Sequence, residues 1–214
     1  MSAPVIWALD VASETGIAEA RVGELPRFYT QRFAHDGDEH EDVFGRALLW
    51  LIERLQVDRP DAIYVEAPLS PGTYGQTNAT TTVRLIGLWA TLAAAVKVKK
   101  VRYCRAKVQT VRSAFLGQGN LEGKEAKRRA GEMCRLLGWA PNNHNEADAG
   151  AILWWASTKE APHLAPIITP LMQQRVATTV GGVDFSDMPR GKRVKGRDLP
   201  QRRGVRMKSA RGFL

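Results

Sequence analysis

The stretch VIWALD, residues 5–10, decides the fold of this chain. A short apolar run that ends on one carboxylate is typical of a buried strand whose last side chain emerges at an edge of the sheet. Two further strands are predicted at residues 16–22 and 27–33, joined by a turn around Gly23 and Pro26. These three segments indicate an antiparallel meander at the start of the chain.

Helices and strands alternate after this meander. Apolar residues recur at helical spacing over residues 36–56, and a buried run at residues 62–66 predicts a fourth strand. The later patterns predict a fifth strand at residues 98–104 and helices at residues 77–96, 105–116, 124–137 and 142–159. Wholly apolar runs place the first and fourth strands in the centre as a parallel pair, and three basic residues place the fifth strand nearer an edge. The sequence therefore predicts an α/β fold, with a mixed five-stranded sheet covered by helices on both faces.

Positive charge is concentrated near the C-terminus. The chain has 214 residues and a net charge of +9, and residues 171–214 contain eleven Lys or Arg but only three Asp or Glu. Phosphate binding by such a segment releases counterions and favours nucleic acid, whereas a solvated basic tail is the simpler alternative. We expect one folded domain at residues 1–161 and a basic, extended or flexible extension at residues 162–214, where Pro and Gly are frequent.

Neither a signal peptide nor a membrane span is predicted. The N-terminus lacks a basic region, and the longest apolar run, residues 85–96, is interrupted by Gly87 and followed by Lys97. The two cysteines, Cys104 and Cys134, have no metal-ligand spacing and are typical of small, partly buried residues in a reducing compartment. We therefore expect a cytoplasmic protein that does not contact a membrane.

Three acidic residues stand where predicted elements end or begin. Asp10 ends the first strand, Glu66 ends the fourth, and Asp148 lies in the first two turns of the last helix. Each alone has a simpler explanation as a turn residue, a solvated strand end or a partner of the helix dipole. However, the carboxyl ends of adjacent parallel strands meet at one edge of a sheet. Converging carboxylates select Mg²⁺ or Mn²⁺, and two such ions about 4 Å apart hydrolyse phosphodiesters.

Three segments are similar in order and spacing to the acidic motifs of the RuvC-type Holliday-junction resolvases: WALDVASETGIA, IYVEAP and HNEADAGAILWWA. The resemblance covers about residues 4–158 and is closer to phage-type members of the family. It implies an RNase H-like fold and a dimeric, metal-dependent endonuclease that nicks four-way DNA junctions. It also implies that Asp10, Glu66 and Asp148 are catalytic residues that bind Mg²⁺, or Mn²⁺ in its place, with two ions in each site.

The fourth metal ligand is the position at which this sequence departs from the family. The family often has Asp or His three residues before the last aspartate, and this chain has Asn145 there, which offers only a neutral oxygen. His144 shares the helix face of Asp148. Glu146 has the required charge, but a two-residue offset points it about 200° away, and with Asn143 it matches a capping box. His144 and Glu146 stay as the two candidates, and Glu146 would then be a further catalytic residue.

The resemblance also assigns DNA and subunit contacts. The helix at residues 77–96 corresponds to the dimer interface of the family, although an ordinary core helix would have the same pattern. Tyr74 stands where the family has an aromatic residue that stacks on a base of the junction. Four basic residues are expected to bind DNA phosphates, rather than only to form a solvated face: Lys107, Lys124, Lys127 and Arg128.

Three other functions share features with a branched-DNA endonuclease. An RNase H-type nuclease that cuts RNA–DNA hybrids or flaps would have the same acidic site. An actin-like or sugar-kinase ATPase would need a Gly-rich phosphate loop, which is missing after Asp10, so we expect no nucleotide cofactor. A DNA-binding module without catalysis would gain nothing from carboxylates that converge near phosphates. The sequence therefore favours a metal-dependent endonuclease acting on Holliday junctions or other branched DNA.

Overall fold

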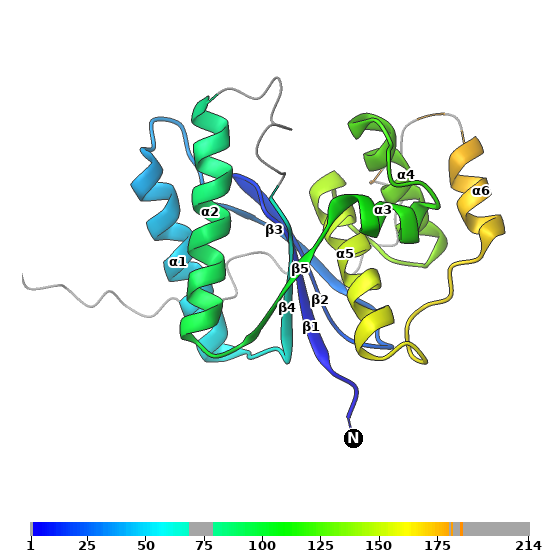
Figure 1. The fold of residues 1–214 in the computed structure, drawn as a ribbon, viewed down its shortest axis with the longest axis horizontal. Helices are drawn as coiled ribbons and strands as arrows, with labels where there is room; N and C mark the ends of the chain where they lie inside the picture. The colour runs from blue at the N-terminus through cyan, green and yellow to red at the C-terminus, as the bar shows by residue number, and fades with distance from the viewer. Residues whose placement is uncertain (1, 69–78, 180, 182–184, 186–214) are drawn as a thin grey trace, which may run out of the picture.

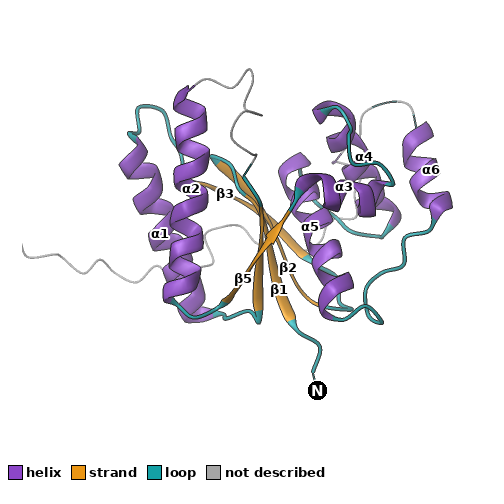
Figure 2. Ribbon diagram, viewed as in Figure 1, coloured by secondary structure: helices purple, strands orange, loops and turns teal. Residues whose placement is uncertain are grey.

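A mixed five-stranded sheet forms the centre of the molecule, with helices on both faces (Figures 1 and 2). The computed structural model describes residues 2–68, 79–179, 181 and 185. The strands are β1 (Val5–Asp10), β2 (Glu14–Arg21), β3 (Arg27–Arg32), β4 (Ala62–Glu66) and β5 (Arg102–Ala106). The helices are α1 (His40–Val57), α2 (Ala79–Val98), α3 (Val108–Leu116), α4 (Gly123–Leu136), α5 (His144–Glu160) and α6 (Pro170–Thr178). The predicted α/β, RNase H-like architecture is confirmed.

The strand order is β3-β2-β1-β4-β5. β1 pairs antiparallel with β2 and parallel with β4, and β5 lies at the edge, as the sequence predicts. β5 pairs parallel with β4. The register sets Asp10 opposite Gly16, Gly16 opposite Thr30, and Glu66 opposite Ala106. One end of the sheet therefore holds a row of residues that runs across all the strands and includes both strand-end carboxylates.

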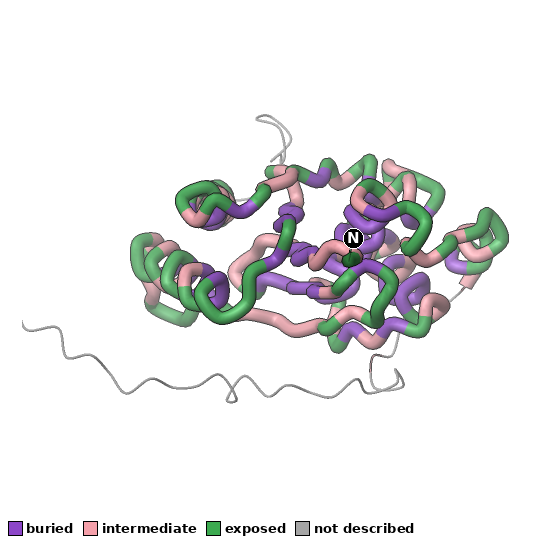
Figure 3. Tube along the Cα trace, turned by 90° about the horizontal axis from the view of Figure 1, so that it is seen from below, coloured by how far each residue is buried: buried purple, intermediate pink, exposed green. Residues whose placement is uncertain are grey.

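The two faces of the sheet carry separate hydrophobic clusters. Ile6 and Ala8 point to the face covered by α3, α4 and α5, whereas Trp7 and Leu9 point to the face covered by α1 and α2. Because successive side chains of a strand point to opposite faces, Asp10 lies on the α5 side. Figure 3 shows buried residues gathered in the interior of the molecule and exposed residues along the outer helices.

A buried ion pair fastens α1 to the sheet. The guanidinium of Arg54 donates to both carboxylate oxygens of Glu19, at 3.0 and 3.2 Å, and stacks on the ring of Trp7. Glu19 also accepts hydrogen bonds from Tyr29 and Arg27. Each charge is therefore neutralised and hydrogen-bonded, which is the condition under which a buried pair is tolerated.

The helix α2 packs along α1 and leaves its other face exposed. Leu88, Leu92, Ala95 and Val96 are buried, and Gly87 allows the Phe44 ring of α1 to pack where a Cβ would lie only 2.0 Å from it. Among the described residues, α2 alone has the length and apolar composition that would suffice to cross a membrane, a property it shares with core helices of soluble proteins. Both cysteines are free thiols.

The structure differs from the sequence-based boundaries at β5. The apolar pattern of α2 continues to Val98, and Lys100, with φ of 54°, makes the turn that follows. β5 therefore begins at Arg102, four residues later than predicted, and continues to Ala106 because that residue pairs with Glu66.

The segment after residue 161 also differs from the expected extended chain, because it contains α6. Thr169 caps this helix by accepting a hydrogen bond from Met172 N, and Pro170 occupies the first turn. Ile168, Met172 and Val176 recur at helical spacing and pack on the α5-side cluster. Most of the basic tail, residues 186–214, lies outside the described residues, so the division of the chain at residue 161 stays a prediction.

Candidate functional site

The N-terminal turn of α5 lies directly on β2. A Cβ at Gly16 would come within 2.0 Å of the carbonyl oxygen of Asn145, so only glycine permits this approach. The Asn145 side chain donates to the carbonyl oxygen of Glu14 at 2.8 Å. Because Gly16 is the strand partner of Asp10, the contact brings the start of α5 next to the end of β1.

Glu146 anchors the same turn of α5 to β3. Its carboxylate is 2% exposed and accepts hydrogen bonds from the Thr30 hydroxyl at 2.9 Å and from the Asn142 backbone N–H at 2.7 Å. The side-chain amides of Asn142 and Asn143 donate to it as well, while Asn143 caps the helix by accepting from Glu146 N. The carboxylate is committed to these donors, so its position does not support the prediction that Glu146 is catalytic or the fourth metal ligand.

Asp10 and Glu66 end the adjacent parallel strands β1 and β4, and Asp148 on α5 interacts electrostatically with both. All three residues are half-buried. Burial, and then repulsion from Glu66, raises the pKa of Asp10 well above its usual range. Burial also raises the pKa of Glu66. The hydrogen bond from Asp10 lowers this pKa, and repulsion from Asp148 raises it. Repulsion and a hydrogen bond thus couple the carboxyls of Asp10 and Glu66.

Asp148 completes the group from the first turns of α5. Burial, followed by the charge of Asp10, raises the pKa of Asp148 from an ordinary value near 4 to about 7. Burial is the larger cause, and the added effect of Asp10 requires that the two carboxyls interact in poorly solvated surroundings. The three acids singled out in the sequence therefore interact electrostatically, and their joint role as a metal site stays a prediction.

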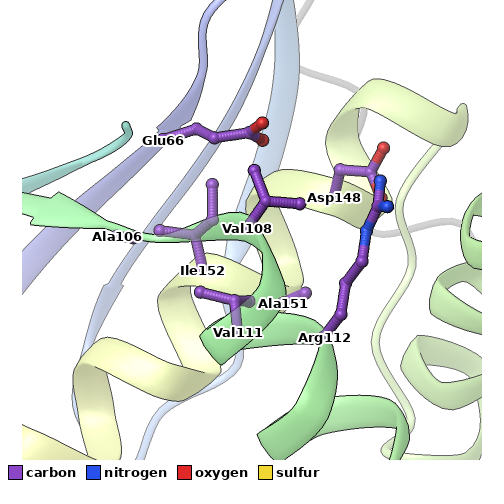
Figure 4. Close-up of a pocket in the computed structure, with 8 residues that line it drawn as sticks. All are labelled: Glu66, Ala106, Val108, Val111, Arg112, Asp148, Ala151 and Ile152. Carbon is purple, nitrogen blue, oxygen red and sulfur yellow. The ribbon is translucent and has the colours of Figure 1, made fainter. Parts of the chain in front are cut away.

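Two cationic side chains interact with the three carboxyls. The positive charges of Lys127, on α4, and Arg112, on α3, partly offset the rise in pKa of Asp10, Glu66 and Asp148. Arg112 and Asp148 line one pocket with Glu66, and Figure 4 shows the guanidinium directed toward the Asp148 carboxylate.

Neither cation is neutralised by a fixed partner. Arg112 and Lys127 form no ion pair or hydrogen bond with another described residue. Lys127 was predicted from the sequence, but Arg112 was missed. The position of Arg112 could have identified it, because it lies one turn into the helix that follows β5. Val108 and Val111 of the same helix line the same pocket.

The other predicted DNA-binding residues have different surroundings. Lys107 is exposed at the start of α3, directly after the residue that pairs with Glu66, and Lys124 is exposed on the first turn of α4. Arg128 is instead committed to protein contacts, because it donates to the Glu125 carboxylate and to the carbonyl oxygen of Val176. Its role in DNA binding is therefore not supported by its position.

His144 and Tyr74 are the remaining predicted site residues. The exposed His144 ring lies edge-on to the ring of Phe185, with centroids 4.9 Å apart. His144 thus stays an uncertain candidate for the fourth ligand, on the face of α5 that also carries Asp148. Tyr74 lies outside the described residues, so its proposed stacking role stays a prediction.

The chemistry of the site fits a divalent cation, although its ligands are not arranged as a ready-made cage. Over residues 2–68 and 79–179, no three His, Cys, Asp or Glu side chains stand close enough together to form a metal site as placed. Asp10 and Glu66 are nevertheless joined by a hydrogen bond, and Asp148 interacts electrostatically with both. A hard dication would relieve the repulsion among them, since carboxylate oxygens are the ligands that Mg²⁺ and Mn²⁺ prefer.

Solved structures of Holliday-junction resolvases are similar to this chain. Thermus thermophilus RuvC aligns with a TM-score of 0.56 and 19% identity over 73% of this chain and 97% of that protein. T. thermophilus RuvC in complex with a Holliday junction substrate aligns with a TM-score of 0.57, at the same identity and coverage. The yeast mitochondrial Holliday junction resolvase Ydc2 aligns with a TM-score of 0.51 and 14% identity, over 75% of this chain and 82% of that one.

These similarities establish the fold. The chain has the RuvC-type resolvase fold that its three acidic segments predicted. At 14–19% identity the similarity says nothing by itself of activity. No protein-family model matches the sequence, and no curated protein matches it either.

The substitution Gly16→Ala is expected to displace α5 from the sheet. The added Cβ would overlap the main chain of Asn145, which cannot move as a flexible side chain can. We expect a loss of about 2 kcal/mol or more in the free energy of unfolding, as for overpacking in a core, measured by urea denaturation. The control is Gly45→Ala in α1, where a Cβ has open space and should stabilise by about 0.5–1 kcal/mol. Equal effects of the two substitutions would contradict the proposed close approach.

The raised pKa of Asp148 predicts a pH-dependent stability in metal-free protein. Between pH 4 and about 7 the folded state holds a proton at Asp148 that an unfolded aspartate has lost. The free energy of unfolding should therefore fall as pH rises through this window, by about 1.4 kcal/mol per pH unit at most. Urea denaturation with a chelator present should give a shallower slope for Asp148→Asn than for wild type. Exposed Glu53→Gln is the control, and an unchanged slope in Asp148→Asn would refute the shift.

Proposed function

We propose that this protein is a divalent-metal-dependent endonuclease that cleaves phosphodiester bonds in branched DNA, with four-way junctions as its main substrate. The observation that carries the proposal is the convergence of Asp10, Glu66 and Asp148 opposite the two cations Arg112 and Lys127. Carboxyls whose pKa is raised by burial cost stability, and such groups cluster at functional sites. In such an arrangement the carboxylates can bind a metal ion, and the cations, which have no fixed partner among the described residues, can bind the phosphate of a substrate.

The substrate assignment is supported by the fold and by the basic residues around the site. Structures with this fold include a resolvase solved with a Holliday junction substrate. Exposed Lys107 and Lys124 stand at the starts of α3 and α4, the helices that carry Arg112 and Lys127. Contacts from such residues to phosphates position a nucleic acid without reading its sequence.

The residues of the site divide the chemistry between them. Asp10, Glu66 and Asp148 would hold Mg²⁺, or Mn²⁺ in its place, in two positions. When bound, the ions supply activation of a water molecule and stabilisation of the leaving oxygen. Arg112 and Lys127 would hold the non-bridging oxygens of the scissile phosphate and offset the charge that develops on them. The buried walls of the pocket, formed by Val108, Val111 and Ile152 among others, limit the access of bulk water.

We also propose that the protein is a homodimer that associates through α2. The outer face of this helix exposes Val83 by 52% and Ile86 by 43%, and Ala90 and Ala94 continue the stripe at helical spacing. An apolar stripe on a helix that packs only along its other face is typical of a protein–protein contact. Two copies joined in this way would place two active sites on one four-armed substrate.

The cleavage prediction is tested with a synthetic four-way DNA junction in Mg²⁺. Wild type should produce paired nicks in opposite strands, and Asp10→Asn should lose at least about 100-fold in single-turnover rate, because a ligand of the activating ion is removed. The exposed Asp36→Asn variant should retain the wild-type rate.

The alternative substrates separate the competing functions. Linear duplex should be cut poorly, and preferential cutting of an RNA–DNA hybrid or a flap would replace the substrate while retaining the site. Tight junction binding without cleavage in either Mg²⁺ or Mn²⁺ would contradict an endonuclease and leave a DNA-binding protein.

The dimer prediction is tested by sedimentation of the protein at micromolar concentration. Ile86→Glu should convert the dimer to a monomer, because it buries a charge in an apolar contact. The matched control, Leu25→Glu, changes a residue that is 75% exposed in the turn between β2 and β3, away from α2. A monomeric wild type, or a dimer in both variants, would show that α2 is not the interface.

A further inference from the structure

We propose that residues 162–179, here called the strap, form a positioning element that holds the two cations of the site in place. The inference rests on the proposed function, because it assigns a catalytic use to Arg112 and Lys127. The strap includes α6 and the chain that leads to it from the end of α5. Figure 1 shows α6 on the outer side of α3 and α4, so that these two helices separate it from the sheet.

The strap is anchored at its start to α5. The indole N–H of Trp154 donates to the carbonyl oxygen of Pro166 at 2.7 Å. The Trp154 ring also packs on Phe115 of α3, with centroids 5.5 Å apart. Thr169 then caps α6, and Val176 is wholly buried in the cluster that includes Phe115. The strap is therefore an ordered part of the domain core on this side of the sheet.

One side chain of the strap closes the end of α3. The amide of Gln173 donates to the carbonyl oxygen of Ala114 at 2.9 Å, which provides a partner for one of the carbonyls that a helix leaves free in its last turn. The same side chain lies against Gly117, the left-handed residue that ends α3, since a Cβ there would be 3.1 Å from Gln173 Oε1. Arg112 precedes Ala114 by only two residues.

A second contact joins the strap to α4. Arg128 forms two hydrogen bonds with Glu125 on its own helix, at 2.8 and 2.7 Å, and its Nη2 also donates to the carbonyl oxygen of Val176 at 2.8 Å. A guanidinium at the C-terminal end of α6 is favourable for the dipole of that helix. Lys127 is the residue directly before Arg128.

These two contacts act on the two helices that carry the cations. The carboxyls stand at the ends of β1 and β4 and on the first turns of α5, whereas the strap is anchored to α5 farther along, at Trp154. Arg112 and Lys127, in contrast, depend on the seating of α3 and α4. Neither cation has a partner of its own among the described residues that would hold it toward the carboxyls. Loosening the strap should therefore move the cations relative to the carboxyls without unfolding the sheet.

The first test is a double-mutant cycle on single-turnover cleavage of the four-way junction. Gln173→Ala combined with Val176→Ala should slow cleavage by about tenfold or more, as small displacements of positioned groups do. Junction affinity without metal should change much less. The control Gln174→Ala alters an exposed residue of the same helix and should have no effect. In an Arg112→Ala/Lys127→Ala background, the strap substitutions should cause little further loss, because residues that act through one another are not additive. A loss of the same factor in both backgrounds would overturn the proposal.

The second test does not depend on activity. Hydrogen–deuterium exchange of the free protein should be faster at α3 and α4 in the Gln173→Ala/Val176→Ala variant than in wild type, while β1 and α5 stay protected. Unchanged exchange at α3 and α4 would overturn the strap as a positioning element. If wild type fails to nick the junction, the proposed function fails, and the exchange experiment still decides whether the strap seats these helices.

Discussion

The approach of α5 to the sheet is the constraint on which the site depends. Asn145 lies on Gly16 of β2 at a distance that excludes any side chain there, and Glu146 is bound to Thr30 of β3. Gly16 and Thr30 are strand partners, and Gly16 also pairs with Asp10. The start of the helix is thus fixed at the level where β1 ends. This placement lets Asp148 interact with the two strand-end acids, Asp10 and Glu66, in poorly solvated surroundings. The raised pKa values of the three carboxyls follow from it.

The placement has an electrostatic cost that the fold only partly offsets. Burial raises the pKa of all three carboxyls, and their repulsion raises it further. The hydrogen bond between Asp10 and Glu66 and the charges of Arg112 and Lys127 reduce this cost. The remaining imbalance is of the kind that natural proteins retain at functional sites and rarely elsewhere. A divalent cation would offset the repulsion among the carboxyls, which is why the arrangement is interpreted as a metal site and not as a structural network.

The sequence predicted the parts of this arrangement that depend on local pattern. Asp10 and Glu66 were found because an apolar run that ends on an acid marks the end of a parallel strand. The contact of Glu146 with Asn143 was predicted from a capping-box pattern, but its hydrogen bond from Thr30 could not be found in this way, because Thr30 is 116 residues away in the chain. Arg112 was hidden in an ordinary helical pattern, and only the packing of α3 directs it toward Asp148.

The C-terminal helix α6 was missed for a different reason, although its sequence does contain a Thr-Pro start and apolar residues at helical spacing. The basic composition of the whole segment outweighed that short pattern.

The central claim, that the three carboxyls bind divalent cations together, is tested most directly by titrating metal-free protein with Mn²⁺ and detecting the free ion by electron paramagnetic resonance. Wild type and Asp36→Asn should bind Mn²⁺ equally, and Asp148→Asn should bind it more than about tenfold more weakly. Equal binding by Asp148→Asn would contradict the account.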